Sequence, residues 1–290
     1  MGSGTPFVRS ARRSGIRYFP CLLGAVLCSL LPARSPAQAT AAMPDTRPYV
    51  VLVTNADQGI GYEFVRQYSE RGWAVIATAR DPRSAAELNA LAGRWDSDVK
   101  VEKLDATSGQ SVRALAARYK GQPIDLLINN MDLTGDIHAQ DYRSFDFGVY
   151  DQIFDANAAA PLRVIGAFMD NVAASRQKRI MTLSSATGSI QLAHGGLLFY
   201  RSSKAALNMA IRTLSREVRQ DPDPQRQALV FGLIDPGSMA GATAGDATSQ
   251  TAIARLTPRE SAEYCIAVIE GYTPVTSGSF LDRKGTALPW

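Results

Sequence analysis

The feature that most constrains the fold is a regular alternation of short apolar runs and helical patterns from about residue 46 onward. Seven runs are rich in apolar and β-branched residues and are bounded by turn-forming residues, which is typical of buried strands. They are Tyr49–Thr54, Ala74–Thr78, Lys100–Leu104, Asp125–Asn129, Arg179–Leu183, Ala228–Ile234 and Gly278–Leu281. Helical patterns occupy Ile60–Arg71, Ser84–Ala92, Ser108–Tyr119, Phe147–Asn171, Tyr200–Arg219 and Pro258–Glu270. This rhythm predicts an α/β fold, a single doubly wound domain with a parallel sheet covered by helices on both faces.

The first 41 residues differ from the rest in charge. Residues 1–42 contain five arginines and no acidic residue, so 26 of the 31 basic residues remain beyond them, against 27 acidic residues. The net charge of +4 therefore comes from the N-terminal segment, and the near-neutral remainder argues against a nucleic-acid partner. The apolar run Phe19–Leu31 is too short to cross a bilayer, and it is followed by small residues at Ala37–Ala41.

This combination predicts a secretory signal peptide over residues 1–41, with the functional domain spanning residues 46–290. We expect the protein to be exported to the periplasm, without a stable membrane span once the signal is cleaved. Two alternatives stay open. The segment is either an uncleaved membrane anchor, or the true start is Met43 and the protein is cytoplasmic.

Several kinds of site are excluded by what the sequence lacks. The three cysteines form no CxxC pair and there are only two histidines, so no metal site is expected. There is no GxSxG elbow for a serine hydrolase and no GxxxxGK[ST] loop for a nucleoside triphosphatase.

A glycine-bearing turn follows the first predicted strand. The segment Thr54–Gly61 reads TNADQGIG and runs into a helix, and its two glycines allow the backbone to approach a pyrophosphate at the helix N-terminus. The second strand ends without the acidic residue that would bind a ribose 2′-hydroxyl. Arg80 follows instead and can pair with a 2′-phosphate, which favours NADP while leaving NAD open. The alternative is a solvated Arg80 paired with Asp81.

The strongest chemical signal is Tyr200-Arg-Ser-Ser-Lys204 at the start of a long helix. Tyrosine and lysine four residues apart lie on one helical face, where the ammonium would lower the pKa of the phenol. Such a tyrosine can exchange a proton with a carbonyl or alcohol oxygen. Ser184 and Ser185 end the fifth strand, at the sheet edge where ligands bind, and can hydrogen-bond the same oxygen. Asp105 ends the third strand near the expected adenine, and Asn129-Asn130 ends the fourth near the expected ribose.

From Tyr49 to Trp290 the chain resembles the short-chain dehydrogenase/reductase family, in particular its C-factor and sniffer-like carbonyl reductase branch. The matching motifs are TNADQGIG, LDATS, NNMD, DANAAAP, LSSATGSI, YRSSKAALNM, DPG and the closing LPW. The resemblance implies a mostly parallel, seven-stranded Rossmann sheet and a homo-oligomer. It implies a catalytic tetrad of Asn157, Ser185, Tyr200 and Lys204, in which Tyr200 is the general acid/base, Ser185 orients the carbonyl and Asn157 positions a water. The residues expected at the cofactor are Thr54, Asn55, Gln58, Gly59, Ile60, Gly61, Arg80, Asp105, Ala106, Asn129, Asn130, Tyr200, Lys204, Pro236 and Gly237.

The sequence departs from the family pattern in the cofactor groove. Asn55 replaces the first glycine of TGxxxGxG, a change that the tolerance of asparagine for left-handed backbone can absorb. Asp57 adds a carboxylate beside the expected diphosphate, and Met131-Asp132 replaces the usual Ala-Gly after the paired asparagines. Ser185 precedes Tyr200 by fifteen residues, a longer spacing than in most of the family, although Ser185 remains the choice over Ser184 or Thr187.

These observations predict an oxidoreductase that transfers hydride between NADP(H) and a small-molecule carbonyl or alcohol. The rival hypothesis is a non-catalytic dinucleotide-binding or signalling protein on the same fold. An epimerase or dehydratase would share the Tyr-Lys pair. The pocket walls are expected to come from 131–146, 186–199 and 238–257, which do not identify a substrate.

Overall fold

The computed structural model describes residues 46–95, 98–238 and 255–290. Thr46–Trp290 forms one unit, separate from Met1–Asp45. The predicted signal peptide and most of the expected pocket segment 238–257 lie outside the described residues.

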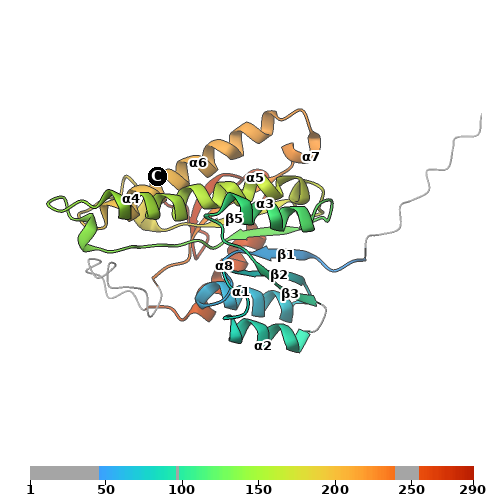
Figure 1. Ribbon diagram of the computed structural model, residues 1–290. Coiled ribbons are helices and arrows are strands. Elements are labelled where there is room, and N and C mark those ends of the chain that lie inside the picture. The colour runs from blue at the N-terminus through green and yellow to red at the C-terminus, as the bar shows by residue number, and fades with distance from the viewer. Residues whose placement is uncertain (1–45, 96–97, 239–254) are drawn as a thin grey trace, which may run out of the picture. The chain divides into compact units, whose positions relative to one another are not determined.

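Seven strands form one sheet in the order β3-β2-β1-β4-β5-β6-β7, and every neighbouring pair is parallel (Figure 1). The strands are β1 (Val50–Val53), β2 (Ala74–Ala79), β3 (Val99–Lys103), β4 (Leu126–Asn129), β5 (Arg179–Leu183), β6 (Val230–Asp235) and β7 (Ser279–Asp282). Side chains alternate between the two faces of each strand, so in β1 Val51 and Val53 join one hydrophobic core and Leu52 joins the other. Both faces are therefore buried, as the continuous apolar runs predict.

Helices cover the two faces of the sheet (Figure 1). One core contains residues from α1 (Gly59–Glu70), α2 (Ala86–Trp95) and α8 (Pro258–Gly271). The other contains residues from α3 (Gly109–Arg118), α5 (Ala160–Ala173) and α6 (Leu198–Glu217). The remaining helical segments are α4 (Phe147–Phe154), α7 (Pro224–Gln227), the π-helical η3 (Asp155–Ala159) and the 3₁₀ turns η2 (His138–Gln140), η4 (Ala186–Gly188) and η5 (Val218–Gln220).

The predicted doubly wound, seven-stranded sheet is confirmed, with element ends shifted by at most three residues. One expectation was wrong. The continuous helix predicted over Phe147–Asn171 is interrupted by the π-helical turn η3. Asn157, inside η3, makes hydrogen bonds to Leu133 and Ser203, and these contacts do not show in the periodicity of the helix itself.

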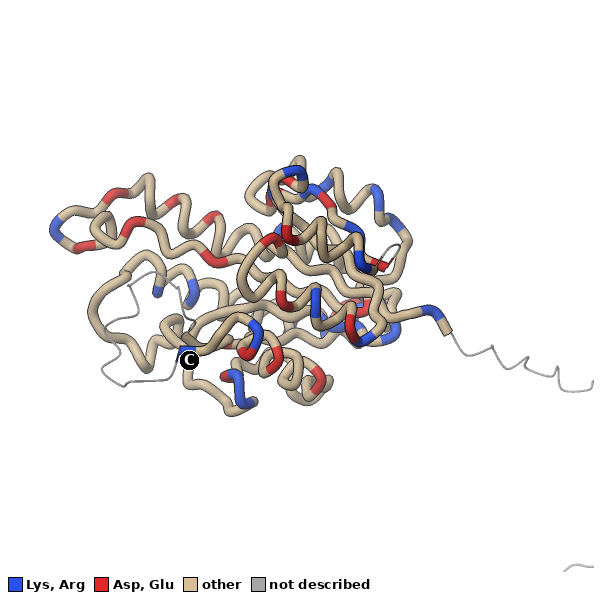
Figure 2. The backbone as a smooth tube through the Cα atoms, turned by 90° about the horizontal axis from the view of Figure 1, so that it is seen from below, with Lys and Arg blue, Asp and Glu red and all other residues tan. Residues whose placement is uncertain are grey.

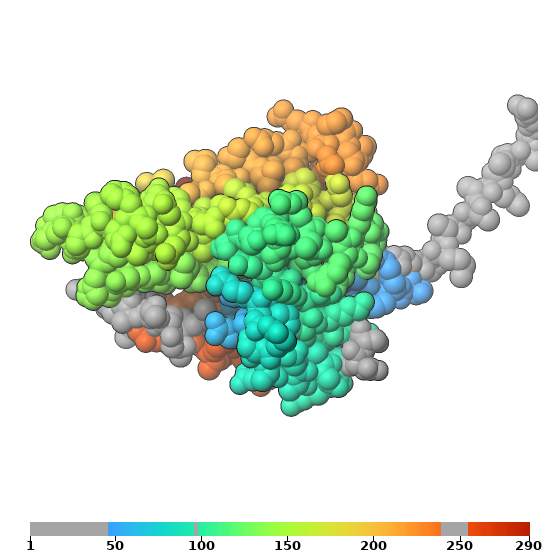
Figure 3. All heavy atoms as spheres, in the orientation of Figure 1, coloured from blue at the N-terminus to red at the C-terminus, as the bar shows by residue number. Residues whose placement is uncertain are grey.

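The order in which strands are added reverses at β1, because β2 and β3 lie on one side of it and β4 to β7 lie on the other. In such sheets ligands bind at the carboxyl ends of the strands beside this switch point. The segment after β4 and helix α4 project at one end of the domain (Figure 3). Acidic and basic residues are interspersed along the described chain (Figure 2).

Candidate active site

The turn between β1 and α1 has the backbone shape expected of a phosphate-binding turn. Asn55 adopts φ 51° and Gly59 φ 56°, so the asparagine supplies the left-handed conformation that the family's glycine would supply. A Cβ on Gly61 would lie 2.3 Å from the backbone oxygen of Asn55 and 2.5 Å from Nδ2 of Asn130, which leaves room only for glycine. The side chain of Gln58, the N-cap of α1, makes no capping hydrogen bond to the first-turn N–H groups, which are the groups that bind anions at a helix N-terminus.

Side chains from the end of β4 hold this turn in place. Asn130 Nδ2 donates to the Asn55 oxygen at 2.9 Å, and Asn130 N donates to Thr54 Oγ1 at 2.8 Å. The Thr54 side chain is fully buried and ties β1 to β4, so its hydroxyl faces the protein interior. Asn129 is also buried, and its Oδ1 has no hydrogen-bond partner among the residues that the structure describes. Ile60 and Ala106 are buried as well, which leaves mainly their backbone to face a ligand.

Arg80 lies beyond the end of β2 with its side chain 72% exposed. Its Nη2 lies 3.9 Å from Oδ1 of Asp105, at the end of β3. Asp105 also accepts hydrogen bonds from the hydroxyl and the backbone of Thr107, and these bonds lower its pKa. The alternative pairing of Arg80 with Asp81 was wrong, because Asp81 binds Arg83. The exposed Arg80 guanidinium is free to turn toward a phosphate on this edge.

Tyr200 and Lys204 lie in the first two turns of α6, one helical turn apart, and both are buried. The Lys204 ammonium lies 5.7 Å from the centre of the Tyr200 ring. The sequence spacing therefore predicted their common face correctly. The backbone N–H of Tyr200 donates to Oε1 of Gln140 at 2.9 Å, and Gln140 Nε2 in turn donates to the carbonyl oxygens of Thr134 and Asp136. Gln140 thus joins the start of α6 to the segment after β4.

The Asp132 carboxylate contacts both the tyrosine and the lysine. Oδ1 of Asp132 accepts the Tyr200 hydroxyl at 3.0 Å and lies 2.8 Å from Nζ of Lys204. Lys204 Nζ also donates to the Met131 carbonyl at 3.2 Å. Burial and the Asp132 carboxylate raise the pKa of Tyr200 well above its ordinary value. Lys204 was expected to lower this pKa, but in this arrangement burial and the Asp132 carboxylate raise it.

Ser185 follows β5 and faces Tyr200. Its Oγ accepts hydrogen bonds from N and Oγ1 of Thr187, at 3.2 and 2.8 Å. A hydroxyl has two acceptor sites and one proton, so the Ser185 proton is left to donate elsewhere. A hydrogen bond with Ser185 acts to lower the pKa of Tyr200. Ser184 instead donates to Oδ1 of Asn208 in the interior at 2.6 Å, so its role is structural.

The Asn157 side chain connects the π-helical turn η3 to the segment after β4 by hydrogen bonds. Its Oδ1 accepts the Leu133 N–H at 2.7 Å, and its Nδ2 donates to the Leu133 carbonyl at 2.9 Å and to Ser203 Oγ at 3.0 Å. The side chain thereby fixes the residue next to Asp132. The positioning of a water by Asn157 stays a prediction.

The end of β6 completes the site. Asp235 lies near enough to Tyr200 to raise its pKa, and burial raises the pKa of Asp235 itself. Gly237, at φ 81°, donates its N–H to Asp235 Oδ1 at 3.3 Å, and the Pro236 carbonyl accepts from Ser261. The sequence reasoning missed the contacts of Gln140 and Asp235. For Asp132 it noted only the added charge, although the departure from the usual glycine was a signal.

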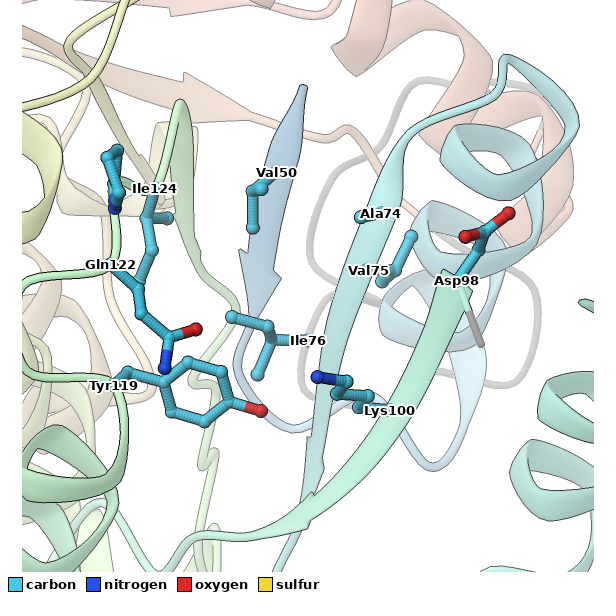
Figure 4. A pocket seen from close by; sticks show the side chains of 10 residues that line it. Val50, Ala74, Val75, Ile76, Asp98, Lys100, Tyr119, Gln122 and Ile124 are labelled. Atoms are coloured by element: carbon cyan, nitrogen blue, oxygen red, sulfur yellow. The ribbon is translucent and has the colours of Figure 1, made fainter. Parts of the chain in front are cut away.

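A cavity of about 140 Å³ lies elsewhere, at the amino ends of β1 and β2, and its lining includes Ile76, Lys100 and Tyr119 (Figure 4). Ligand pockets usually measure about 300–1,000 Å³, so this cavity is too small to compete as the substrate site. Among the described residues, no group of histidine, cysteine and acidic side chains could hold a metal ion. In the same part of the chain, no helix is long and apolar enough to cross a membrane.

The fold and these groups define a Rossmann-type dinucleotide-binding protein with a serine–tyrosine–lysine site at the carboxyl edge of its sheet. The short chain dehydrogenase family model matches residues 49–247, and the chain belongs to this family. The resemblance seen in the motifs is therefore confirmed.

Relatives and solved structures agree with this assignment. The chain is 34% identical to C-signal of Myxococcus xanthus over 181 residues, which cover 62% of this chain and 100% of the relative. It is 32% identical to a 1-hydroxy-2-glutathionyl-2-methyl-3-butene dehydrogenase of Rhodococcus sp. over 83% of this chain and 99% of the relative. An NADPH-bound carbonyl reductase from chicken fatty liver superposes with TM-score 0.72 at 31% identity, covering 84% of this chain and 100% of that one. A carbonyl reductase from Pseudomonas aeruginosa in complex with NADP gives TM-score 0.69 at 27% identity, covering 83% and 100%.

Proposed function

We propose that the protein is an NADP(H)-dependent carbonyl reductase acting on a small-molecule carbonyl or alcohol. The observation that carries the proposal is the convergence of Ser185, Tyr200 and Lys204, from two different elements, at the carboxyl edge of the sheet. Two solved relatives that superpose closely hold NADPH or NADP, which supports the same cofactor here.

In this function the bound cofactor supplies the hydride to the carbonyl carbon. Tyr200 donates its phenolic proton to the carbonyl oxygen, and its burial keeps that proton bound until a substrate oxygen arrives. Ser185 has its proton free to hydrogen-bond the same oxygen, because Thr187 occupies both of its acceptor sites. Lys204 places a positive charge 5.7 Å from the centre of the Tyr200 ring, and it shares this charge with the Asp132 carboxylate.

The first test removes the phenolic hydroxyl with Tyr200→Phe. General acid catalysis contributes about 10²–10⁴-fold, so we expect turnover of a panel of carbonyl compounds, followed by NADPH oxidation, to fall by at least about 100-fold. Tyr264→Phe, at an exposed position on α8, is the matched control and should keep full activity. Retained turnover in Tyr200→Phe would refute the assignment of the proton donor.

The residues present fit a dinucleotide. Asn130 lies so close to Gly61 that only glycine fits in the turn, and the N-cap side chain of α1 makes no capping hydrogen bond. Arg80 is proposed to bind the 2′-phosphate. Hydrogen bonds to charged groups contribute about 1.5–3 kcal/mol, so Arg80→Ala should weaken NADPH binding at least about tenfold and leave NADH binding nearly unchanged. Arg83→Ala, in the neighbouring Arg83–Asp81 pair, is the control. Equal losses for both cofactors would overturn the role given to Arg80.

A non-catalytic signalling role is the second candidate. It is favoured by the similarity to the relative named C-signal and by the ion pair that Lys204 forms with Asp132. Fluorescence titration with NADPH and NADH separates the two. Binding of NADPH together with turnover supports the reductase, whereas no binding of either cofactor favours the signalling role.

We also propose that residues 1–41 are removed on export to the periplasm and that the mature protein is a homo-oligomer. N-terminal sequencing of the protein from its native cells tests the first point. A start near Thr40 supports export, and a start at Met43 or Pro44 would place the enzyme in the cytoplasm. Analytical ultracentrifugation tests the second point, and a monomer would refute it.

A further inference from the structure

The Asp132 carboxylate contacts both Tyr200 and Lys204. One oxygen, Oδ1, contacts the Tyr200 hydroxyl at 3.0 Å and the Lys204 ammonium at 2.8 Å. Asp132 and Tyr200 are 68 residues apart in the sequence. Their contact therefore depends on how the segment after β4 packs on α6. The Asn157 side chain makes hydrogen bonds to the backbone N–H and carbonyl of Leu133. These bonds hold the backbone next to Asp132.

The exposures of Lys204 and Asp132 differ sharply. The Lys204 side chain is 1% exposed, whereas that of Asp132 is 54% exposed. The buried ammonium is thus paired with a carboxylate that water can still reach. In this ion pair the nearby opposite charge offsets part of the cost of burying the ammonium.

Four charged or polar groups lie around Tyr200. The carboxylates of Asp132 and Asp235 both oppose formation of a phenolate, the Ser185 hydroxyl favours it, and the Lys204 ammonium has its charge balanced by Asp132. Of the two carboxylates, only Asp132 accepts a hydrogen bond from the tyrosine. That bond can form only while the tyrosine keeps its proton.

We propose that Asp132 is a positioning residue that holds Tyr200 as a protonated donor and so directs the enzyme toward carbonyl reduction. The inference rests on the proposed function. In reduction, hydride passes to the carbonyl carbon, the Tyr200 O–H bond breaks, its proton joins the carbonyl oxygen, and the phenolate then takes a proton from solvent. The negative charge of Asp132 favours the protonated form of Tyr200, from which reduction begins. It disfavours alcohol oxidation, which must begin from the phenolate.

The experiment compares wild type with Asp132→Asn, a variant that keeps the size and the acceptor oxygen but removes the charge. Ultraviolet titration of tyrosinate, with the Tyr200→Phe background subtracted for each, reports the ionisation of Tyr200 without any need for turnover. We expect the Tyr200 signal in Asp132→Asn to appear at least about one pH unit lower than in wild type. An unchanged Tyr200 signal, including its absence from both proteins, would overturn the inference.

The pH profiles of turnover give a second readout. In Asp132→Asn the alkaline loss of reductive kcat should move to lower pH, and the ratio of oxidative to reductive kcat at neutral pH should rise. Asp151→Asn, an exposed carboxylate on α4, is the matched control and should leave both profiles unchanged. Asp132→Ala provides the same comparison if the asparagine variant folds poorly.

The proposed reductase function and the proposed role of Asp132 are refuted by different results. If wild type turns over no carbonyl compound, the proposed function fails while the tyrosinate titration still tests Asp132. If wild type is active and the profiles of Asp132→Asn coincide with it, Asp132 does not position the proton and the proposed function stands.

Discussion

Gly61→Ala tests whether the close approach at the first βα turn holds the cofactor site together. The added Cβ would lie 2.3 Å from the Asn55 oxygen and 2.5 Å from Asn130 Nδ2, so both neighbours must move by about 1 Å to reach ordinary contact. Overpacking of this kind costs about 1–3 kcal/mol, and loss of the hydrogen bond between Asn130 and Asn55 adds about 1 kcal/mol. We therefore expect a loss of about 2–4 kcal/mol in the free energy of unfolding.

For a domain of this size that loss lowers Tm by roughly 5–15 °C, which differential scanning calorimetry measures. Because the turn that moves is the proposed pyrophosphate site, NADPH affinity measured by fluorescence titration should fall by at least about tenfold. Gly93→Ala is the control, since a Cβ at this exposed position of α2 meets no atom within 4 Å and alanine favours the helix. Wild-type Tm and affinity in Gly61→Ala would refute the reasoning.

Two further predictions concern groups around Tyr200. Burial raises the pKa of Asp235, so its stabilising contribution is fully present below the unfolded value of about 3.9 and is lost as the pH rises through the higher folded value. Asp235→Asn should therefore raise Tm near neutral pH, with a gain that shrinks on acidification, and a gain independent of pH would contradict this. Gln140→Ala removes the side-chain bonds to Tyr200, Thr134 and Asp136 and should lower the free energy of unfolding in urea by about 1–3 kcal/mol. Unchanged urea stability would show that Gln140 does not hold α6 to this segment.

Much of the fold could be predicted because its signals are local. The apolar runs of β1 and β5 identify buried strands without reference to any neighbour, and the parallel sheet follows from their alternation with helices. The shared face of Tyr200 and Lys204 likewise follows from helical spacing alone. The left-handed backbone of Asn55 also agrees with a property of the residue itself.

The interrupted helix shows where local reasoning fails. The sequence of 147–171 has a continuous helical pattern, yet η3 replaces α-helix around Asn157. Within this turn Asn157 makes hydrogen bonds to Leu133, which is 24 residues away along the chain, and to Ser203. A periodicity measured within one helix carries no information about such partners.

By itself, then, the sequence determined the class of fold, the position of the glycine turn, and the shared helical face of the tyrosine and lysine, because each depends on residue type and short spacing. Only the tertiary structure decided the electrostatics of that site. Asp132 and Tyr200 lie on different elements, and their contact exists only because the segment after β4 folds against the start of α6. The charge on Asp132 could be read from the sequence, but its effect on Tyr200 depends on a separation of 3.0 Å between two atoms that only packing brings together.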